Sequence, residues 1–389
     1  MRLHAARTAL SLALTLASAA AARAQAPADT GVVRTDVAAA LDTLMKRLEA
    51  FGLSGALLVA ERGEVILHRG YGLASRERGL RVRPETPFLI AALSMQFTAA
   101  AILKLEADGK LTTTDTLGRF FPQAPADKRG LTLHQILTHT AGFPLLEADK
   151  FAAVNRDQLM REVLALPLQS APGGQPLFSY PGYALLAGVI ERASGETFER
   201  YLTSRLFRPA GMRSTGFFGE ARWLAPGVVT RSYTDSSDEG PLGQFPGGAK
   251  AVGSGSIVTT AGDLYRWERA LRDTLILPDS AKQKFWTPHA TLGDSPNAYG
   301  YGWVVQRTAR GTRMIAHAGD LFGYNSEMRR YVDDNFTVIF LSNARTDGFG
   351  YREVPLETIE LRMAGVPGGL DPPALASRRP PPAALRALG

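Results

Sequence analysis

The sequence predicts an α+β fold in which one antiparallel sheet is built from both chain ends and a helical lobe is inserted between them. Two observations lead to this prediction. Strand-like segments occur at 56–71 and again after residue 300, where apolar and polar residues alternate, whereas helical segments punctuated by Gly and Pro fill the middle. Strands at both ends with helices between them favour a single shared sheet.

The N-terminal part is expected to form a helix followed by a hairpin. Residues 37–51 have apolar side chains at helical spacing, and a glycine follows them. A glycine at this position is typical of a helix end. Residues 56–60 and 65–71 are then expected to form two strands around a turn at Arg62-Gly63, which indicates a hairpin.

Helices dominate the middle of the chain, and strands return near its end. Residues 96–108 are Ala-rich and helical, and 183–202 hold two helices separated by a Ser-Gly break. A final helix is expected at 352–363. The C-terminal segments that alternate like antiparallel strands are 301–306, 313–316, 327–332 and 337–341.

The first 24 residues have the layout of a secretory signal. Arg2, His4 and Arg7 precede the apolar stretch 9–22, which ends in small residues. An uncleaved anchor is the alternative, but the stretch is short and contains Ser and Thr. We therefore expect an exported protein, periplasmic or secreted, with no transmembrane segment after signal removal. Residues 25–365 are expected to fold as the main domain, and the Pro-rich 366–389 to form a disordered tail.

Composition excludes several classes of function. The 389 residues contain no cysteine, which removes thiol nucleophiles, thiolate zinc sites and iron–sulfur clusters. The net charge is +7, but six arginines against one aspartate at the two ends leave +2 for residues 25–366. No basic run is interleaved with aromatic residues, so we expect no nucleic-acid partner. The histidine spacing and the absence of a phosphate loop predict neither a metal nor a cofactor.

Five blocks carry a resemblance to a known family. Residues 88–111 (FLIAALSMQFTAAAILKLEADGKL) and 131–144 (LTLHQILTHTAGFP) are followed by 172–183, 253–267 and 317–343. In this order and spacing they resemble the serine β-lactamase and penicillin-binding-protein family, of the class C type with its esterase and D-peptidase relatives. The resemblance implies a β-lactamase/transpeptidase-like fold and acyl transfer through a serine ester. It also implies Ser-x-x-Lys, Tyr-x-Asn and Lys/His-x-Gly motifs beside a backbone oxyanion hole.

The first family motif is degenerate in this chain. It aligns with Ala92-Leu93-Ser94-Met95, because the helix sequence from Gln96 follows without a gap. Ala92 therefore stands where the family has its nucleophile, and Met95 where it has its amine. Ser94 lies two residues further on, a rotation of about 200° along a helix. We expect Ser94 to be an ordinary packed or solvated helix residue.

The second family motif allows two alignments. Without a gap, Phe178-Ser179-Tyr180 replaces Tyr-x-Asn, so that Phe178 stands for the tyrosine and Tyr180 for the asparagine. With a deletion, Tyr180 keeps the place of the tyrosine and Gly182 takes that of the asparagine. The ungapped alignment is favoured, and the amide is absent in both.

The third family motif is retained as His317-Ala318-Gly319, with Asp320 where the family often has a small residue. Backbone donors do not depend on side chains, so the N–H groups of Ala92 and Asp320 are expected to keep a notch for a carbonyl or an anion. If Asp320 faces the cleft, its carboxylate would repel anionic ligands. A further serine-rich stretch at 253–256 lacks the Gly-x-Ser-x-Gly pattern and is expected to be a turn before a helix.

These losses predict an exported pseudoenzyme with no intact catalytic residue. Removing one member of a catalytic unit costs about a million-fold in turnover, nearly as much as removing all. The residues expected to line the remaining cleft are Ala92, Met95, Phe178, Tyr180, His317, Gly319 and Asp320. Such a cleft suits a small-molecule ligand, a cell-wall fragment or a protein partner. The alternatives are a weak or non-standard hydrolase of the esterase, D-peptidase or β-lactamase type that uses Tyr180 or His317, and a decaying copy without a selected role.

Overall fold

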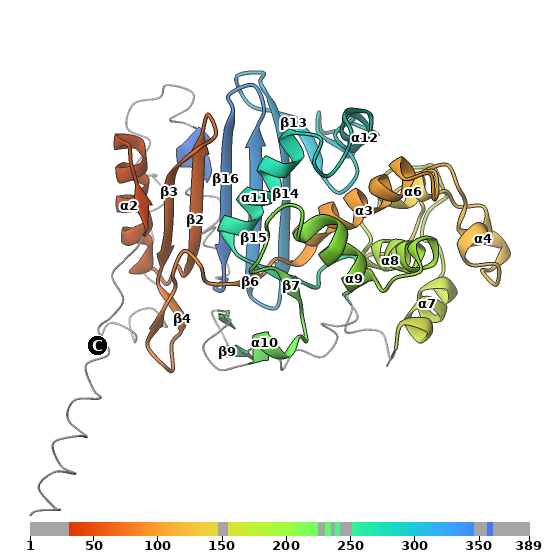
Figure 1. Ribbon diagram of the computed structural model, residues 1–389, viewed down its shortest axis with the longest axis horizontal. Helices are drawn as coiled ribbons and strands as arrows, with labels where there is room; N and C mark the ends of the chain where they lie inside the picture. Colours follow the sequence, from red (N-terminus) through yellow and green to blue (C-terminus); the bar gives the residue numbers. More distant parts are fainter. Residues whose placement is uncertain are drawn as a thin grey trace, which may run out of the picture. The chain divides into compact units, whose positions relative to one another are not determined.

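A computed structural model describes residues 31–146, 155–224, 230–234, 238–241, 251–345 and 356–360. Its main feature is a nine-stranded antiparallel sheet (Figure 1). In spatial order the strands are β1 (Val32–Val33), β3 (Glu64–Tyr71), β2 (Gly55–Glu61), β16 (Phe336–Ser342), β15 (Tyr324–Tyr331), β14 (Arg313–Leu321), β13 (Val304–Arg307), β12 (Ala298–Tyr299) and β11 (Ala290–Thr291). Because β2 pairs with β16, the predicted sheet built from both chain ends is confirmed.

Short sheets and helices complete the described residues. The shorter strands pair β6 (Phe88–Leu89) and β7 (Gly216–Phe217) with β10 (Ile257–Thr259), β4 (Leu73–Ser75) with β5 (Leu80–Arg81), and β8 (Arg231–Tyr233) with β9 (Asp238–Pro241). The helices are α2 (Asp36–Glu49), the 3-10 turn η1 (Ala91–Ser94), α3 (Met95–Ala107), α4 (Leu117–Phe120), α5 (Ala126–Arg129), α6 (Leu133–Leu137), α7 (Arg156–Ala165), α8 (Tyr180–Ser194), α9 (Phe198–Leu202), the π-helical turn η3 (Thr203–Phe207), α10 (Ala221–Leu224), α11 (Ala261–Arg272) and α12 (Asp279–Phe285).

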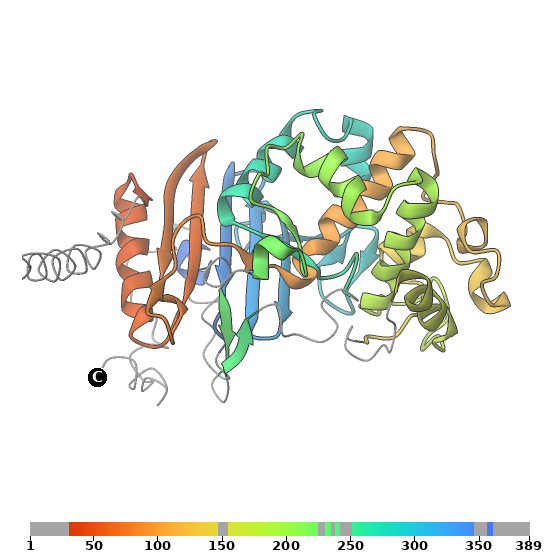
Figure 2. The same ribbon diagram turned by 60° about the horizontal axis from the view of Figure 1, so that its bottom comes forward.

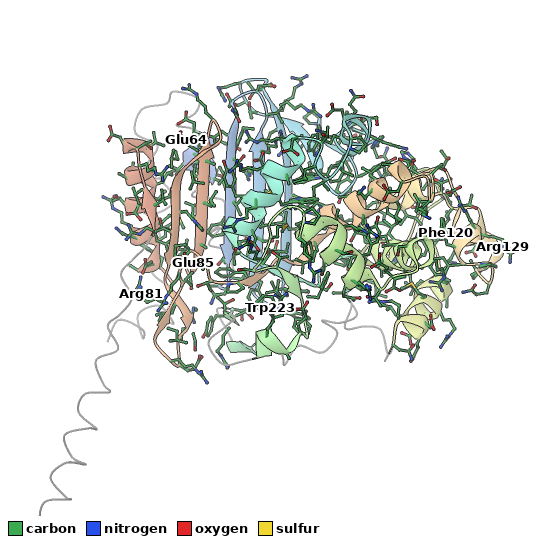
Figure 3. All side chains as sticks on the ribbon, in the orientation of Figure 1. Glu64, Arg81, Glu85, Phe120, Arg129 and Trp223 are labelled. Carbon is green, nitrogen blue, oxygen red and sulfur yellow. The ribbon has the colours of Figure 1, made fainter. Side chains whose placement is uncertain are left out.

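Two hydrophobic cores lie on opposite faces of the sheet, because successive side chains of a strand point to opposite sides. In β2, Leu57 and Val59 belong to the core under α2, whereas Leu58 belongs to the larger core that contains α3, α8 and α11. In the two ribbon views, helices α4, α6, α7, α8 and α9 gather apart from strands β2 and β3 (Figures 1 and 2). Side chains fill the space between these helices and the sheet (Figure 3).

Most predicted elements are present with small shifts at their ends. The first helix begins at Asp36, where the Thr35 hydroxyl caps it by accepting from the Ala38 N–H. The hairpin turns through Arg62 and Gly63 at φ values of 51° and 88°. The break between α8 and α9 falls at Gly195, and the stretch 253–256 is a turn that leads into β10 and α11, as predicted.

Two of the C-terminal strands differ from the prediction. The strand expected at 301–306 begins only at Val304, because the chain bends through Gly302 with φ 71°. A Cβ at Gly302 would lie 2.8 Å from the carbonyl oxygen of Met95, so the bend lets the chain pass closely over the start of α3. The strand expected at 313–316 runs on to Leu321.

Several predictions concern segments outside the described residues. The signal at 1–24 and the tail at 366–389 lie there, as do parts of the predicted final helix, of which 356–360 are helical. No helix of the described ranges has the length and apolar character needed to cross a membrane.

Candidate functional site

The positions expected to hold a serine and a lysine lie in the turn that opens α3. Ala92 is part of η1, and Met95 is the first residue of α3. Ala92 is 5% exposed and Met95 is fully buried. The Met95 thioether lies 3.9 Å from the hydroxyl oxygen of Tyr299, a close packing contact between sulfur and oxygen. Neither position carries a nucleophile or a base.

Gly319 brings β14 into direct contact with this turn. A Cβ at Gly319 would lie 2.3 Å from the carbonyl oxygen of Ile90 and 2.8 Å from the backbone nitrogen of Ala92. Such distances exclude any side chain at this position unless the backbone moves. The retained glycine of the third motif therefore sets the distance between the strand and the Ala92 amide.

Asp320 does not join the other cleft residues through its side chain. His317 and Gly319 face the core that contains α3, and alternation along β14 places Asp320 on the opposite face of the sheet. There its carboxylate accepts a hydrogen bond from the side-chain amide of Asn325, its cross-strand partner. The condition under which its carboxylate would repel anionic ligands is therefore not met, because that carboxylate lies on the face of the sheet opposite to His317 and Gly319.

His317 is held as a neutral imidazole with one defined tautomer. Its Nδ1 lies 2.7 Å from the carbonyl oxygen of Ala318, which can only accept, so Nδ1 carries the proton. Its Nε2 lies 2.8 Å from the Tyr299 hydroxyl and therefore accepts from it. Burial lowers the pKa of His317 to about 4. Burial also raises the pKa of Tyr299 well above its ordinary value, so this hydroxyl keeps its proton.

A second histidine, His139, packs against Tyr299, the hydrogen-bond partner of His317. His139 packs against Phe178, Tyr183 and Tyr299, with ring centroids 4.4, 5.0 and 4.7 Å away. We call these residues with His317 the His-aromatic cluster. From the sequence, neither His139 nor Tyr299 was assigned a role. His139 stood only within the block 131–144 and among the histidines without metal-ligand spacing, and Tyr299 lies in none of the five blocks.

The His139 ring leaves one buried donor without a partner. The Ser179 backbone N–H donates to His139 Nδ1 at 3.1 Å, so Nε2 carries the proton of the neutral ring. That Nε2 is buried and has no hydrogen-bond partner among the described residues. Burial lowers the pKa of His139 to about 3, and the backbone holds the residue at φ 60°.

Phe178 and Tyr180 form the partly exposed edge of the cluster. Ser179 caps α8 by accepting from the Gly182 N–H, which places Phe178 just before the helix and Tyr180 at its first position. The rings of Phe178 and Tyr180 meet edge to face at 5.4 Å, and the Phe178 ring lies 6.3 Å from that of His317. Both side chains therefore adjoin the cluster, and the choice between the two alignments of the second motif stays a prediction.

Ser94 and Ser254, two serines near the motif positions, make hydrogen bonds within the packed structure. Ser94 is buried, and its hydroxyl accepts a hydrogen bond from the Ile257 backbone N–H at 3.3 Å. Ser254 donates to the carbonyl oxygen of Ala251 within its turn. No group of three or more His, Asp or Glu side chains suited to a metal ion occurs in the ranges that the structure describes.

The fold and the motif positions define a protein of the serine β-lactamase and penicillin-binding-protein class. The family model described as Beta-lactamase matches residues 37–358, and the chain belongs to this family. It is 30% identical over 352 residues to Penicillin-binding protein 4* of Bacillus subtilis (strain 168), covering 84% of this chain and 76% of that protein. The predicted family and fold are confirmed.

Solved structures give the same fold. The penicillin-binding protein from Bacillus halodurans superimposes with a TM-score of 0.68 at 25% identity, covering 83% of this chain and 99% of that chain. The D-amino acid amidase from Ochrobactrum anthropi SV3, complexed with L-phenylalanine, gives a TM-score of 0.73 at 20% identity, covering 84% and 98%. The second likeness concerns the fold alone.

Proposed function

We propose that this member of the β-lactamase family is an exported pseudoenzyme that binds a ligand in the family cleft without forming an acyl ester. The observation that carries the proposal is the pair Ala92 and Met95 at the nucleophile and amine positions. Acyl transfer needs an attacking oxygen and a base that removes its proton. An alanine methyl and a buried thioether supply neither.

The other groups of the site do not replace that pair. The Nε2 lone pair of His317 is engaged by the Tyr299 hydroxyl, and its pKa of about 4 makes it a weak base. Tyr299 is a very weak acid because burial raises its pKa. Phe178 has no hydroxyl with which to relay a proton. This arrangement supports binding over hydrolysis.

The ligand class follows from the accessible edge of the site. Phe178 and Tyr180 are half-buried and offer an aromatic wall, and Ala92 offers a backbone amide beside β14. A small molecule or a cell-wall fragment with a carbonyl group and an apolar side chain fits these features. Relatives named for penicillin binding or D-amino acid amide chemistry make acylated D-amino acids the first ligands to test.

The deciding experiment is the intact mass of the protein after incubation with a reactive penicillin and with an activated ester. The control variant carries Ala92→Ser, Met95→Lys, Phe178→Tyr and Tyr180→Asn. We expect no adduct on the natural chain and an adduct on the control. An adduct on the natural chain would overturn the proposal, and peptide mapping would then identify the nucleophile.

The alternative is a weak or non-standard hydrolase that uses Tyr180 or His317, and the retained His-x-Gly segment is the observation in its favour. It predicts ester hydrolysis that falls in Tyr180→Phe and His317→Ala. Hydrolysis that is the same in both variants and in the natural chain would come from a contaminant.

A further inference from the structure

A pocket with a basic lining lies between helices α11 and α12 and the hairpin formed by β13 and β14. Its volume is about 950 Å³, and none of the cleft residues lines it. The basic side chains in the lining are Arg272, Lys282, Arg307, Arg313 and Arg330, against one carboxylate, Asp279. Trp286, Pro288 and Val305 supply part of an apolar wall. The pocket thus combines a strong positive charge with an apolar surface.

Three of these arginines project from one face of the sheet. Arg307 lies directly opposite Arg313 in the register of β13 and β14. Arg330 lies opposite Ile315, two residues along β14 from Arg313, so its side chain shares that face. Like charges directly opposite each other on antiparallel strands destabilise the pair. The row therefore carries an electrostatic cost within the free protein.

The carboxylate beneath the pocket offsets this cost in part. Glu268 is 1% exposed at its side chain and lies 3.1 Å from Arg330 and 2.8 Å from Arg272, so that one carboxylate serves two guanidinium groups. Arg330 is itself only 17% exposed. Burial and the charges of Arg272 and Arg313 lower the pKa of Arg330, although Glu268 acts to raise it.

The remaining two arginines bind backbone oxygens. Arg313 donates to the carbonyl oxygen of Trp286 at 2.8 Å, and Arg307 donates to that of Gly311 at 2.7 Å. Each guanidinium has five N–H donors, and a carbonyl oxygen carries no full charge to neutralise it. Of the acids close by, Asp279 pairs with Lys282, and Asp333 accepts from the backbone of Arg313.

Trp286 contacts both Arg313 and Arg330. The guanidinium carbon of Arg330 is 4.8 Å from the centroid of the Trp286 ring, and Arg313 donates to the carbonyl oxygen of Trp286. A group bound by these two guanidiniums would have the indole and Pro288 beside it. The geometry thus provides adjoining places for an anionic head and an apolar body.

We propose that this pocket binds a small organic anion, with a carboxylate or phosphate head held by Arg313 and Arg330 and an aromatic or acyl body packed against Trp286. The guanidinium fork matches the geometry of both oxyanions. Binding would neutralise the arginine row, which the protein's own carboxylates leave in excess. The site does not depend on the proposed function of the family cleft.

Calorimetric titration of the full-length protein tests the proposal with phenyl phosphate and benzoate as probes, and with inorganic phosphate and benzyl alcohol as the separate head and body. We expect at least one of the two aromatic anions to bind more tightly than either part, and its affinity to fall with added salt. The stronger of the two identifies the head as phosphate or carboxylate. Arg313→Gln should weaken this binding about ten-fold, the value of one hydrogen bond to a charged group.

Stability measurements and a control variant separate loss of binding from loss of folding or of overall charge. Arg313 and Arg307 bind only backbone carbonyls among the described side-chain contacts, so Arg307→Gln and Arg313→Gln should leave the unfolding midpoint unchanged or raise it. Arg200→Gln, at a side chain 78% exposed on α9, is the matched loss of charge elsewhere and should bind as the natural chain does. No heat from either aromatic anion, or equal affinity in Arg313→Gln and Arg200→Gln, would overturn the proposal.

Discussion

The substitution Met95→Lys tests whether this site still suits the family's amine. Met95 is fully buried, and its thioether lies beside the Tyr299 hydroxyl of the His-aromatic cluster, whose two imidazoles are neutral. A lysine here would have no carboxylate from that cluster beside it. Because a buried unpaired ammonium is costly, we expect the lysine to lose its proton when the protein folds.

The cost follows from the proton that must be released. A lysine in the unfolded chain has a pKa of about 10.4, so holding it neutral at pH 7 costs about 5 kcal/mol at 1.36 kcal/mol per pH unit. This is a large part of the stability of an ordinary domain. The unfolded state binds the extra proton, so the free energy of unfolding should rise with pH by about 1.4 kcal/mol per unit.

The assay is urea unfolding of Met95→Lys at several pH values between 7 and 10, with Met95→Leu as the control. Leucine conserves the volume, so it should cost less than about 1.5 kcal/mol and show the pH dependence of the natural chain. A lysine variant as stable as the leucine variant at pH 7, with no added slope, would refute the reasoning. It would mean that the site can accommodate a cation, so that a serine at position 92 and a lysine at position 95 could be introduced with little loss of stability.

Two further predictions follow from the same contacts. Gly319→Ala should destabilise the fold by about 1–3 kcal/mol, because its Cβ would strike the backbone of Ile90 and Ala92. Gly130→Ala is the control. Gly130 follows Arg129 on the helical lobe (Figure 3), has negative φ, and a Cβ added there would have no neighbouring atom within 4 Å. In thermal unfolding, the stability of this variant should be unchanged or raised by about 0.4–1 kcal/mol. In acid, His317 stays neutral when folded down to pH about 4, while the unfolded chain protonates near pH 6.5. Stability should therefore fall below pH 6.5 by about 1.4 kcal/mol per unit, and His317→Phe should reduce that slope in urea titrations; an unchanged slope would show that His317 is not held neutral.

Local patterns predicted the elements well, because they depend on neighbours in the chain. The apolar runs 56–60 and 337–341 become strands that are buried on both faces of the sheet, and β2 pairs with β16 as expected. The face on which Asp320 lies could not be predicted in this way. One residue of register moves a side chain to the other face of the sheet, and the strand predicted at 313–316 ended before Asp320, whereas β14 continues to Leu321.

Contacts between distant segments explain the residues that the sequence analysis missed. Tyr299 reaches Met95 across 204 residues, and His139 meets Ser179 across 40. Neither pair has a spacing rule, because the fold alone brings them together. The arginine row was hidden for the same reason, since it depends on the pairing of Arg307 with Arg313 across a hairpin.

The local backbone of the cleft bears on the choice between a binding protein and a decaying copy. Ala92 and Met95 are buried like other core residues. Nevertheless, Ala91 and His139 have φ values of 47° and 60°, and His139 has a buried donor without a described partner. Each such residue carries a cost of about 1–3 kcal/mol that the surrounding structure must overcome. A site without a selected role would lose such costly features. Their presence beside the Gly319 contact favours the proposed ligand-binding cleft over a decaying copy.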